Sequence, residues 1–287
     1  MALRIATWNI NSVRLRLENL RRLIAAAKPD IICLQETKVE DKDFPRAAVA
    51  EMGYPHLQIR GMKSYNGVAI LSRIPFAEAG TRDWCGRQDS RHAFVGLAGG
   101  IEIHNFYVPA GGNVPDPEQN DKFAHKLSFL DDMAGWFEAR RKEPNRFILT
   151  GDLNIAPLET DVWSHKQLLN VVSHTPVEVA SLGRLGASHD WVDAVRHFHP
   201  PGGTAVLMVE LSRPRLGSQR PRTAARSHMG DAGAQRAPRG RLCAKGGPRL
   251  GASLGPRAGD RQLERRRPAV NDGNLIRWIW RPGVYPH

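Results

Sequence analysis

The chain has 287 residues, and its 41 lysine and arginine residues against 29 aspartate and glutamate residues give it a net charge of +12. Its three cysteines form no C-x-x-C pair, which argues against a disulfide framework and for a reducing compartment. The N-terminus has no secretory-signal pattern and no window approaches the ~18 apolar residues of a membrane span, so we expect a cytoplasmic protein.

The positive charge is confined to the last third of the chain. Residues 1–200 carry 24 basic and 24 acidic side chains, whereas residues 201–287 carry 17 and 5. The net charge alone is therefore no evidence that the first 200 residues bind nucleic acid.

Residues 1–200 alternate between strand and helix patterns, which predicts an α/β fold. Short apolar runs predict strands at residues 3–8, 31–34, 67–71, 101–108 and 147–150. Helical spacing predicts a helix over residues 17–27, with Ser12 as its N-cap and Pro29 beyond its end. A second helix is predicted over residues 123–137, with Lys122 and Lys126 beside its apolar face, and a third lies within residues 161–200.

Polar residues stand where four of these strands end: Asn9; Glu36; Asn105 and Tyr107; Asp152 and Asn154. Strands of one sheet can present their ends at a common edge, so we expect these side chains to share a cleft. Oxygen ligands without a cysteine or histidine core suit Mg²⁺, with Mn²⁺ as an alternative. Such a site leaves room for a phosphate and a water molecule.

Each of these residues also has an ordinary structural explanation. Asparagine at a strand end is commonly a turn residue, Glu36 could be a surface acid, and Tyr107 could be a half-buried aromatic residue. Lys122 and Lys126 could form a solvated helix face. The histidines show no ligand spacing and are interpreted as structural: His92, His104 and His125. Composition by itself indicates only a soluble α/β domain.

Six ordered segments resemble the exodeoxyribonuclease III / AP endonuclease family of the endonuclease/exonuclease/phosphatase superfamily, over about residues 1–200. They are Ile5-Ala-Thr-Trp-Asn-Ile-Asn-Ser-Val-Arg14, Pro29-Asp-Ile-Ile-Cys-Leu-Gln-Glu-Thr-Lys38, Tyr65-Asn-Gly-Val-Ala-Ile-Leu-Ser72, Asn105-Phe-Tyr-Val-Pro-Ala-Gly-Gly112, Lys122-Phe-x-x-Lys-Leu127 and Leu149-Thr-Gly-Asp-Leu-Asn-Ile-Ala156. The resemblance implies a four-layer αββα sandwich of two facing sheets. It also implies a Mg²⁺-dependent enzyme of DNA repair, acting as a monomer on double-stranded DNA at abasic sites and 3′ ends.

The resemblance also implies roles for individual residues. Asn9, Glu36, Asp152 and Asn154 are expected at the metal. Tyr107 is expected on the phosphate, with Asp152 activating water and Asn154 orienting or stabilising. Arg91, Lys122 and Lys126 are expected to contact DNA.

The resemblance stops near Pro201, which divides the chain into an incomplete nuclease domain (1–201) and a basic tail (202–287). The tail is rich in Gly, Pro and Arg, has no strand or helix period, and is expected to be disordered. The family's closing motifs (Trp-Trp-Ser-Tyr, Asp-His and Ser-Asp-His) are absent from the tail. We therefore expect the closing strands to be missing from this chain and its activity to be impaired.

A reading-frame shift explains this break. Met208 and Met229 each precede a residue whose codon begins with G, so both become tryptophan codons when read one base later. Those two tryptophans fall at the ends of a family-like string, and the codons of Ser253-Leu-Gly-Pro-Arg-Ala-Gly259 can encode Pro-Ser-Asp-His-Val-Pro-Val. The alternatives are a genuinely different tail and a functional basic extension.

Two other functions stay open at this point. One is another phosphodiesterase or phosphatase of the same superfamily, against which the Tyr107-Val-Pro loop and the Lys122-x-x-x-Lys126 helix favour the nuclease branch. The other is an inactive basic product that binds nucleic acid without sequence preference. The scarcity of aromatic residues for base stacking in the tail counts against it.

Overall fold

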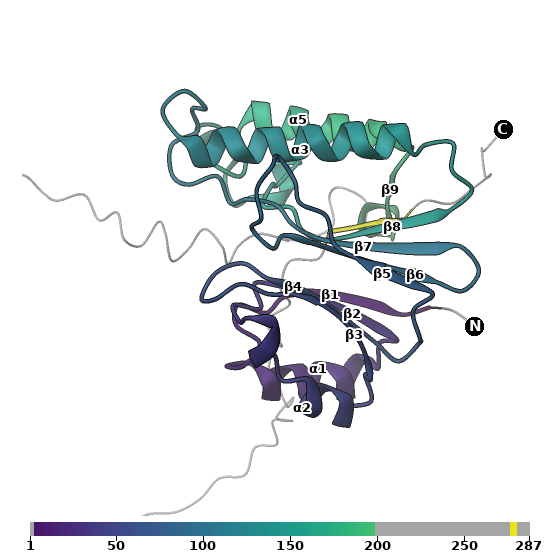
Figure 1. The fold of residues 1–287 in the computed structure, drawn as a ribbon. Coiled ribbons are helices and arrows are strands. Elements are labelled where there is room, and N and C mark those ends of the chain that lie inside the picture. Colours follow the sequence, from purple (N-terminus) through teal and green to yellow (C-terminus); the bar gives the residue numbers. More distant parts are fainter. Residues whose placement is uncertain (1–2, 199–275, 280–287) are drawn as a thin grey trace, which may run out of the picture.

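A computed structural model describes residues 3–198 and 276–279 of the chain. These residues form two sheets that face each other (Figure 1). The first sheet has the order β1 (Ile5–Asn9), β2 (Ile31–Gln35), β4 (Val68–Ser72), β3 (His56–Arg60). The second has the order β5 (Glu78–Gly80), β6 (His92–Leu97), β7 (Ile101–Tyr107), β8 (Arg146–Asp152), β10 (Ile276–Ile279), β9 (Val192–Asp193).

Both sheets are mixed. β1 and β2 are parallel, as are β7 and β8, whereas the other pairs are antiparallel. Parallel neighbours end at the same edge of their sheet. The register pairs Asn9 with Gln35, next to Glu36, and Tyr107 with Asp152. The strand ends that carry the predicted site therefore lie side by side within each sheet.

Helices cover the outer face of each sheet (Figure 1). α1 (Leu17–Ala27) and α2 (Arg46–Glu51) lie on the first sheet, and α3 (Asp121–Ala139) and α5 (Pro176–Ser188) lie on the second. Shorter elements are the 3₁₀ turns Asp41–Asp43 and Glu159–Asp161, α4 (His165–Leu168) and α6 (Ala194–Phe198). The arrangement is helix, sheet, sheet, helix, so the predicted four-layer α/β sandwich is confirmed.

Three apolar cores separate the layers. One joins α1 and α2 to the first sheet, around Leu20, Ile32 and Leu34. Another joins α3 and α5 to the second sheet, around Phe106 and Phe129. The third lies between the two sheets. Because β2 and β4 face a core on both sides, all ten of their residues are buried, and both strands are rich in apolar residues as this position requires.

Three histidines that were interpreted as structural are indeed interior residues. His92 and His104 are fully buried, their Nε2 and Nδ1 atoms lie 3.0 Å apart, and the ring of His92 stacks on Phe106 at 4.3 Å between centroids. His125 is buried beside Asp89, with its Nε2 3.2 Å from a carboxylate oxygen. All three lie in the core of the second sheet or at its margin.

Two sequence-based expectations differ from the structure. Ser12 does not cap α1: the backbone N–H of Ser12 donates to Glu36 O at 2.7 Å, which ties this segment to the end of β2, and the helix begins after Arg16 without a side-chain cap. The closing strands were expected to be missing, and the described part of the tail contributes one short strand, since Ile276–Ile279 pair with β8 and β9 as β10. Apart from β10, residues 202–287 lie outside the described residues, and so does the expectation that the tail is disordered.

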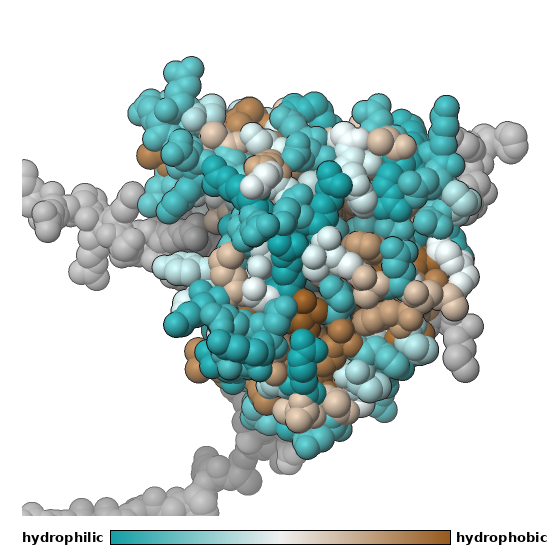
Figure 2. Space-filling model, in the orientation of Figure 1, coloured by the Kyte–Doolittle hydropathy of each residue, from teal (hydrophilic) through white to brown (hydrophobic). Residues whose placement is uncertain are grey.

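The described part of the molecule has a polar exterior over its helices. In Figure 2, hydrophilic residues predominate over α3, and hydrophobic ones gather lower, at the level of the first sheet. Among the described residues, none of the helices has both the length and the apolar character needed to cross a bilayer.

Candidate active site

The four strand ends meet at one place, where the edges of the two sheets face each other. Asn9 Nδ2 donates to Glu36 Oε1 and to Asp152 Oδ2, each at 2.8 Å. Tyr107 donates its phenolic O–H to the same Glu36 oxygen, also at 2.8 Å. One amide thus bridges two carboxylates from different sheets, and a phenol completes the cluster.

The backbone around this cluster is held in unusual conformations. Glu36 and Asn154 both have left-handed φ angles, 53° each, which turn the chain sharply where β2 and β8 end. Gly151 has φ 138°, and a Cβ at this position would lie 1.9 Å from Phe106 O of the neighbouring strand. Only glycine allows that approach, which explains the first residue of the Gly-Asp-Leu-Asn segment.

The two carboxylates differ in their electrostatic environment. Burial raises the pKa of Glu36, but hydrogen bonds with Asn9, Lys38 and Tyr107 outweigh burial and hold it below the ordinary range. The pKa of Asp152 is raised, mainly by its burial and further by the nearby charge of Glu36. The surroundings of Glu36 therefore favour its ionised form, whereas those of Asp152 favour its protonated form, each relative to the free side chain.

Tyr107 is held as a neutral hydrogen-bond donor. Burial first, and then the negative charges of Glu36 and Asp152, raise the pKa of its hydroxyl well above the usual range. Arg91 supports the ring: its guanidinium carbon lies 4.9 Å from the ring centroid, and Nη1 donates to Tyr107 O at 3.1 Å. These two contacts of Arg91 thus fix the orientation of the phenol ring.

Asn154 is fixed by three hydrogen bonds in the loop after β8. Its backbone N–H donates to Asp152 Oδ1 at 3.0 Å, and its side-chain Nδ2 donates to Val108 O at 2.9 Å. Its backbone oxygen accepts a bond from Lys126 Nζ at 2.7 Å. Asn154 therefore sets the orientation of the Asp152 carboxylate.

Asn105, which the sequence places at the same strand end, lies elsewhere. It is fully buried between the sheets, where Nδ2 donates to Leu34 O at 2.9 Å and to Ala69 O at 3.0 Å. Its Oδ1 accepts a bond from Gln35 Nε2 at 2.6 Å. Asn105 joins the two sheets and does not face the carboxylate cluster.

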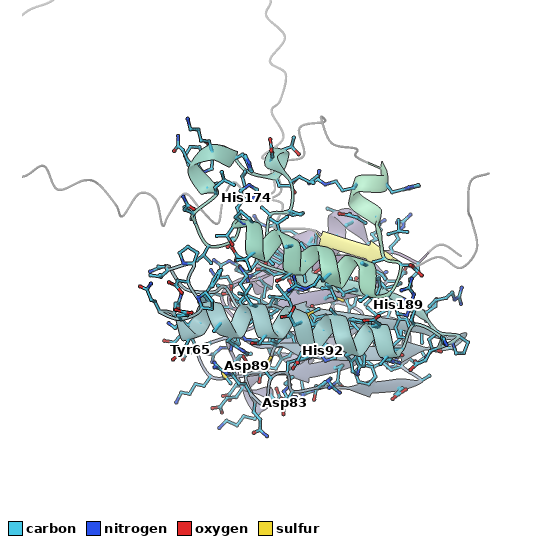
Figure 3. All side chains as sticks on the ribbon, turned by 90° about the horizontal axis from the view of Figure 1, so that it is seen from above. Tyr65, Asp83, Asp89, His92, His174 and His189 are labelled. Atoms are coloured by element: carbon cyan, nitrogen blue, oxygen red, sulfur yellow. The ribbon has the colours of Figure 1, made fainter. Side chains whose placement is uncertain are left out.

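The residues expected to contact DNA occupy three different environments. Lys122 is exposed. Arg91 has a side chain only 13% exposed and is paired with Asp89, which Figure 3 shows beside Tyr65 at one end of the molecule. Lys126 is fully buried in an ion pair with Glu178, so the expectation that it touches DNA is wrong. The ordinary interpretation of both lysines as a solvated helix face holds for Lys122 only.

The structure adds a site residue that sequence reasoning missed. Lys38 Nζ lies 2.7 Å from Glu36 Oε2 and donates to Asn11 Oδ1 at 2.6 Å. Lys38 also lines a cavity of about 240 Å³ whose other walls include three further cations and two acids: Arg14, Lys42, Lys63, Glu40 and Asp43. The available signal was the position of Lys38, two residues after Glu36 in the same segment.

The donor set fits a hard divalent cation. Glu36 and Asp152 offer carboxylate oxygens, and the amide oxygens of neighbouring asparagines are ligands of the same class. Among the residues that the structure describes, no group of three or more His, Cys, Asp or Glu side chains could hold a metal ion. Within the described residues, Glu36 and Asp152 would give an ion at this place two carboxylates, and a site with few carboxylates leaves positions for phosphate oxygens and water, as Mg²⁺ prefers.

This combination of a four-layer sandwich with a carboxylate pair at the facing sheet edges defines a class of protein. The sequence profile of the Endonuclease/Exonuclease/phosphatase family matches residues 6–207, and the chain belongs to this family. Two curated relatives are Exodeoxyribonuclease III of Haemophilus influenzae, 28% identical over 165 residues, and Exodeoxyribonuclease of Bacillus subtilis, 24% identical over 201 residues. The matches cover 56% and 69% of this chain, and 60% and 76% of the two relatives.

The chain is also similar to solved structures. The chain resembles an AP endonuclease from Archaeoglobus fulgidus with 33% identity and a TM-score of 0.63. It also resembles a 3′ phosphatase from Neisseria, solved bound to a product DNA hairpin, with 29% identity and a TM-score of 0.64. Each comparison covers 70% of this chain and 76% of the other.

Proposed function

We propose that this chain is a Mg²⁺-dependent hydrolase of DNA phosphodiesters, of the exodeoxyribonuclease III type, whose activity is impaired by its altered C-terminal third. The observation that carries the proposal is the pair of carboxylates, Glu36 and Asp152, bridged by Asn9 beside a cavity lined by four cations. The cavity has four cations against two acids, Glu40 and Asp43, so its net positive charge would attract a polyanion. The relatives named above are two exodeoxyribonucleases, an AP endonuclease and a 3′ phosphatase solved with product DNA, which supports DNA as the substrate.

In this proposal the residues of the cluster divide the work of hydrolysis. Asp152 accepts a proton from the attacking water, which its raised pKa favours. The Tyr107 hydroxyl gives up its hydrogen bond to Glu36 and donates a hydrogen bond to a phosphate oxygen instead. Asn9 keeps the two carboxylates together, and Asn154 orients Asp152 and stabilises the charge that develops on the phosphate.

Glu36 and Asp152 would hold the Mg²⁺, with Asn9 and Asn154 as neighbouring amide ligands. In the structure, Asn9 directs its nitrogen at both carboxylates, so a ligand role for Asn9 requires its amide to turn over. When bound, the ion would supply Lewis-acid stabilisation of negative charge on the phosphate.

The proposed DNA contacts are Lys122 and Arg91. Lys122 is exposed on the first turn of α3, and Arg91 lies behind Tyr107. A cytoplasmic location and a monomeric state complete the proposal, and both rest on the sequence and the resemblance. Mn²⁺ is expected to substitute for Mg²⁺, because it takes the same oxygen ligands.

Impairment follows from the frame-shift hypothesis, whose residues lie outside the described part of the chain except for β10. The resemblance assigns the missing Ser-Asp-His motif a place beside Glu36 and Asp152. Loss of one positioned acid–base group costs about 10²–10⁴-fold, and loss of one electrostatic donor about 10²–10³-fold. Such losses are not additive when the residues act as a unit.

The test uses three substrates with the chain as written and with the frame-restored chain: a duplex with an abasic site, a duplex with a recessed 3′ end and a duplex with a 3′ phosphate. We expect EDTA-sensitive cleavage by the frame-restored chain and little or none by the chain as written. The 3′-phosphate substrate is included because of the Neisseria phosphatase relative. If the frame-restored chain leaves all three intact but hydrolyses a non-nucleic phosphodiester, the alternative within the superfamily is correct.

A further inference from the structure

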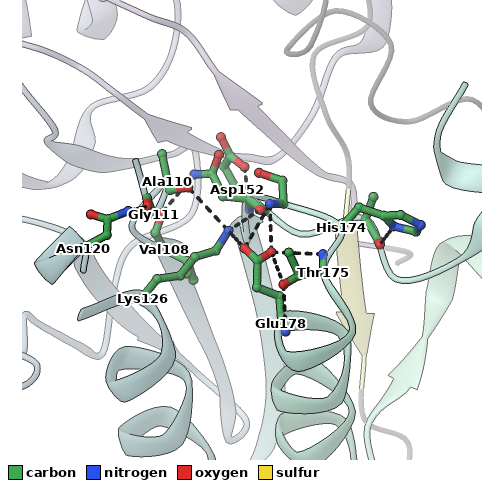
Figure 4. A network of polar contacts seen from close by, with 12 residues as sticks. Val108, Ala110, Gly111, Asn120, Lys126, Asp152, His174, Thr175 and Glu178 are labelled. Atoms are coloured by element: carbon green, nitrogen blue, oxygen red, sulfur yellow. Dashed lines mark hydrogen bonds and ion pairs between the residues drawn. The ribbon is translucent and has the colours of Figure 1, made fainter. Parts of the chain in front are cut away.

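A buried ion pair lies directly behind the proposed active site (Figure 4). Lys126 of α3 and Glu178 of α5 are both fully buried, and Lys126 Nζ is bonded to Glu178 Oε1. Removal of two charges from water costs several kcal/mol for each, so such a pair is weak evidence of a purely stabilising role. An apolar pair of similar volume would join the two helices as well.

Glu178 organises the segment that precedes α5. Its carboxylate accepts bonds from the backbone N–H of Ser173, at 3.0 and 2.9 Å, and from the backbone N–H of Thr175, at 3.1 Å. Thr175 Oγ1 adds a bond at 2.7 Å. Ser173 O in turn accepts a bond from Ala156 N at 2.8 Å. The position of the carboxylate is therefore set by the backbone, independently of Lys126.

Lys126 connects the Glu178 carboxylate to the loop after β8, which contains Asn154. Its Nζ donates to Asn154 O at 2.7 Å, with Ala110 O further away at 3.5 Å. Asn154 has a left-handed φ of 53°, a region that few non-glycine residues occupy and that asparagine adopts more readily than most. The N–H of the same residue holds Asp152 Oδ1 at 3.0 Å. A continuous series of bonds thus runs from Glu178 through Lys126 and Asn154 to Asp152.

We propose that Lys126, held by Glu178, is a positioning residue that fixes the backbone of Asn154 and through it the carboxylate of Asp152. Lys126 itself is buried and touches neither DNA nor the reacting atoms. The inference rests on the proposed function in one respect, that Asp152 is the group that activates water. It replaces the DNA contact that the sequence suggested for Lys126.

The experiment separates positioning from stability with a charge-neutral pair in the full chain. Lys126→Met/Glu178→Gln removes both charges, and the side-chain amide oxygen of the introduced glutamine can still accept a bond from the Ser173–Thr175 backbone. We expect this variant to keep a melting temperature close to that of the parent, because no uncompensated charge is left. Lys126→Met alone should melt much lower. Lys142→Met, at an exposed position of the loop after α3, is the matched lysine control.

The first readout is hydrogen exchange of the Asn154 amide, which needs no substrate. We expect at least ~10-fold faster exchange in the double variant than in the parent or in Lys142→Met, because the bond to Asp152 is no longer enforced. Glu178→Gln alone should shift exchange in the same direction by a smaller factor, and it serves as the second variant if the double variant does not fold. Parental exchange at Asn154 in a folded variant would overturn the proposal.

The second readout is the split between kcat and KM on an abasic-site duplex, in the frame-restored chain. Loss of a residue that orients a ligand or base typically costs 10–100-fold, so we expect kcat to fall about that much while KM stays near the parental value. Parental kcat in a stable double variant would overturn the positioning role while leaving the proposed function intact. A parent without activity on DNA would instead count against the proposed function, and the exchange measurement would still decide the positioning role.

Discussion

Replacement of Asn9 by alanine tests how the site keeps two carboxylates together. Asn9 Nδ2 donates to Glu36 Oε1 and Asp152 Oδ2 at 2.8 Å each, so Asn9→Ala removes two hydrogen bonds to charged acceptors. Hydrogen bonds to charged groups contribute about 1.5–3 kcal/mol each where water is excluded. Because Asn9 is only partly buried, water can replace part of that contribution, and we expect a loss of about 1–3 kcal/mol in the free energy of unfolding.

The same change exposes each carboxylate to the other. Two bonds of 2.8 Å to one nitrogen allow an oxygen–oxygen separation of about 5 Å, at which two unit charges repel by ~3 kcal/mol for an effective dielectric constant near 20. The pKa of Asp152, already raised by burial and by Glu36, should therefore rise further in Asn9→Ala. A base must be deprotonated to act, so the acidic limb of the pH–rate profile should move to higher pH.

The assay measures kcat/KM against pH on an abasic-site duplex, in the frame-restored chain, together with a urea unfolding curve. We expect a loss of about 10–100-fold near pH 7 that shrinks as the pH rises. Asn145→Ala is the matched control, since Asn145 Nδ2 donates to a carboxylate oxygen of Glu102 at 3.3 Å near the opposite end of β7. An Asn9→Ala profile with its acidic limb in the parental position would refute this reasoning.

Two further predictions concern stability. Gly151→Ala should lower the free energy of unfolding, measured in urea, by about 2–4 kcal/mol, because its Cβ would lie 1.9 Å from Phe106 O. Gly183→Ala is the control: its Cβ meets nothing within 4 Å, so this change should be neutral or stabilising. Equal urea midpoints for the two variants would contradict the clash. Burial raises the pKa of Glu102, but its hydrogen bonds, including two from Arg140, outweigh burial and bring it down to about 2 from 4.5. The resulting stability is present above pH 4.5 and is lost as the pH falls towards 2. Glu102→Gln should therefore remove at most about 3 kcal/mol from the free energy of unfolding at pH 7 and weaken its dependence on pH in the acid range. An unchanged dependence on pH in that range would contradict this prediction.

The strand ends of the fold could be predicted because they depend on local pattern. Short apolar runs located β1, β2, β4, β7 and β8 to within one or two residues. The parallel pairing of β1 with β2 places Asn9 beside Glu36, and that of β7 with β8 places Tyr107 beside Asp152, whereas the facing of the two sheets brings the two pairs together. Less regular elements, such as α2, β3 and β5, have weak patterns, and the sequence did not indicate them.

Features that depend on tertiary packing could not be predicted. Lys122 and Lys126 are one turn apart on α3, and the sequence treats them alike. Lys126 is buried because α5 places Glu178 over it, whereas Lys122 lies on the first turn of α3 and stays exposed. Asn105 and Tyr107 point to the same side of β7, but only Tyr107 reaches the edge where the carboxylates lie, since Asn105 is held between the sheets. Such distinctions require knowledge of which elements face each other.

The most direct measurement of the central claim is the initial rate of Mg²⁺-dependent incision of an abasic-site duplex. It compares the chain as written, the frame-restored chain, and the frame-restored chain carrying Asp152→Asn, each with and without EDTA. We predict EDTA-sensitive incision by the frame-restored chain, little or none by the chain as written, and a loss of about 10²–10⁴-fold in Asp152→Asn. Incision at the parental rate by Asp152→Asn, or no incision by the frame-restored chain, would contradict the assignment of the Glu36–Asp152 cluster as the catalytic site.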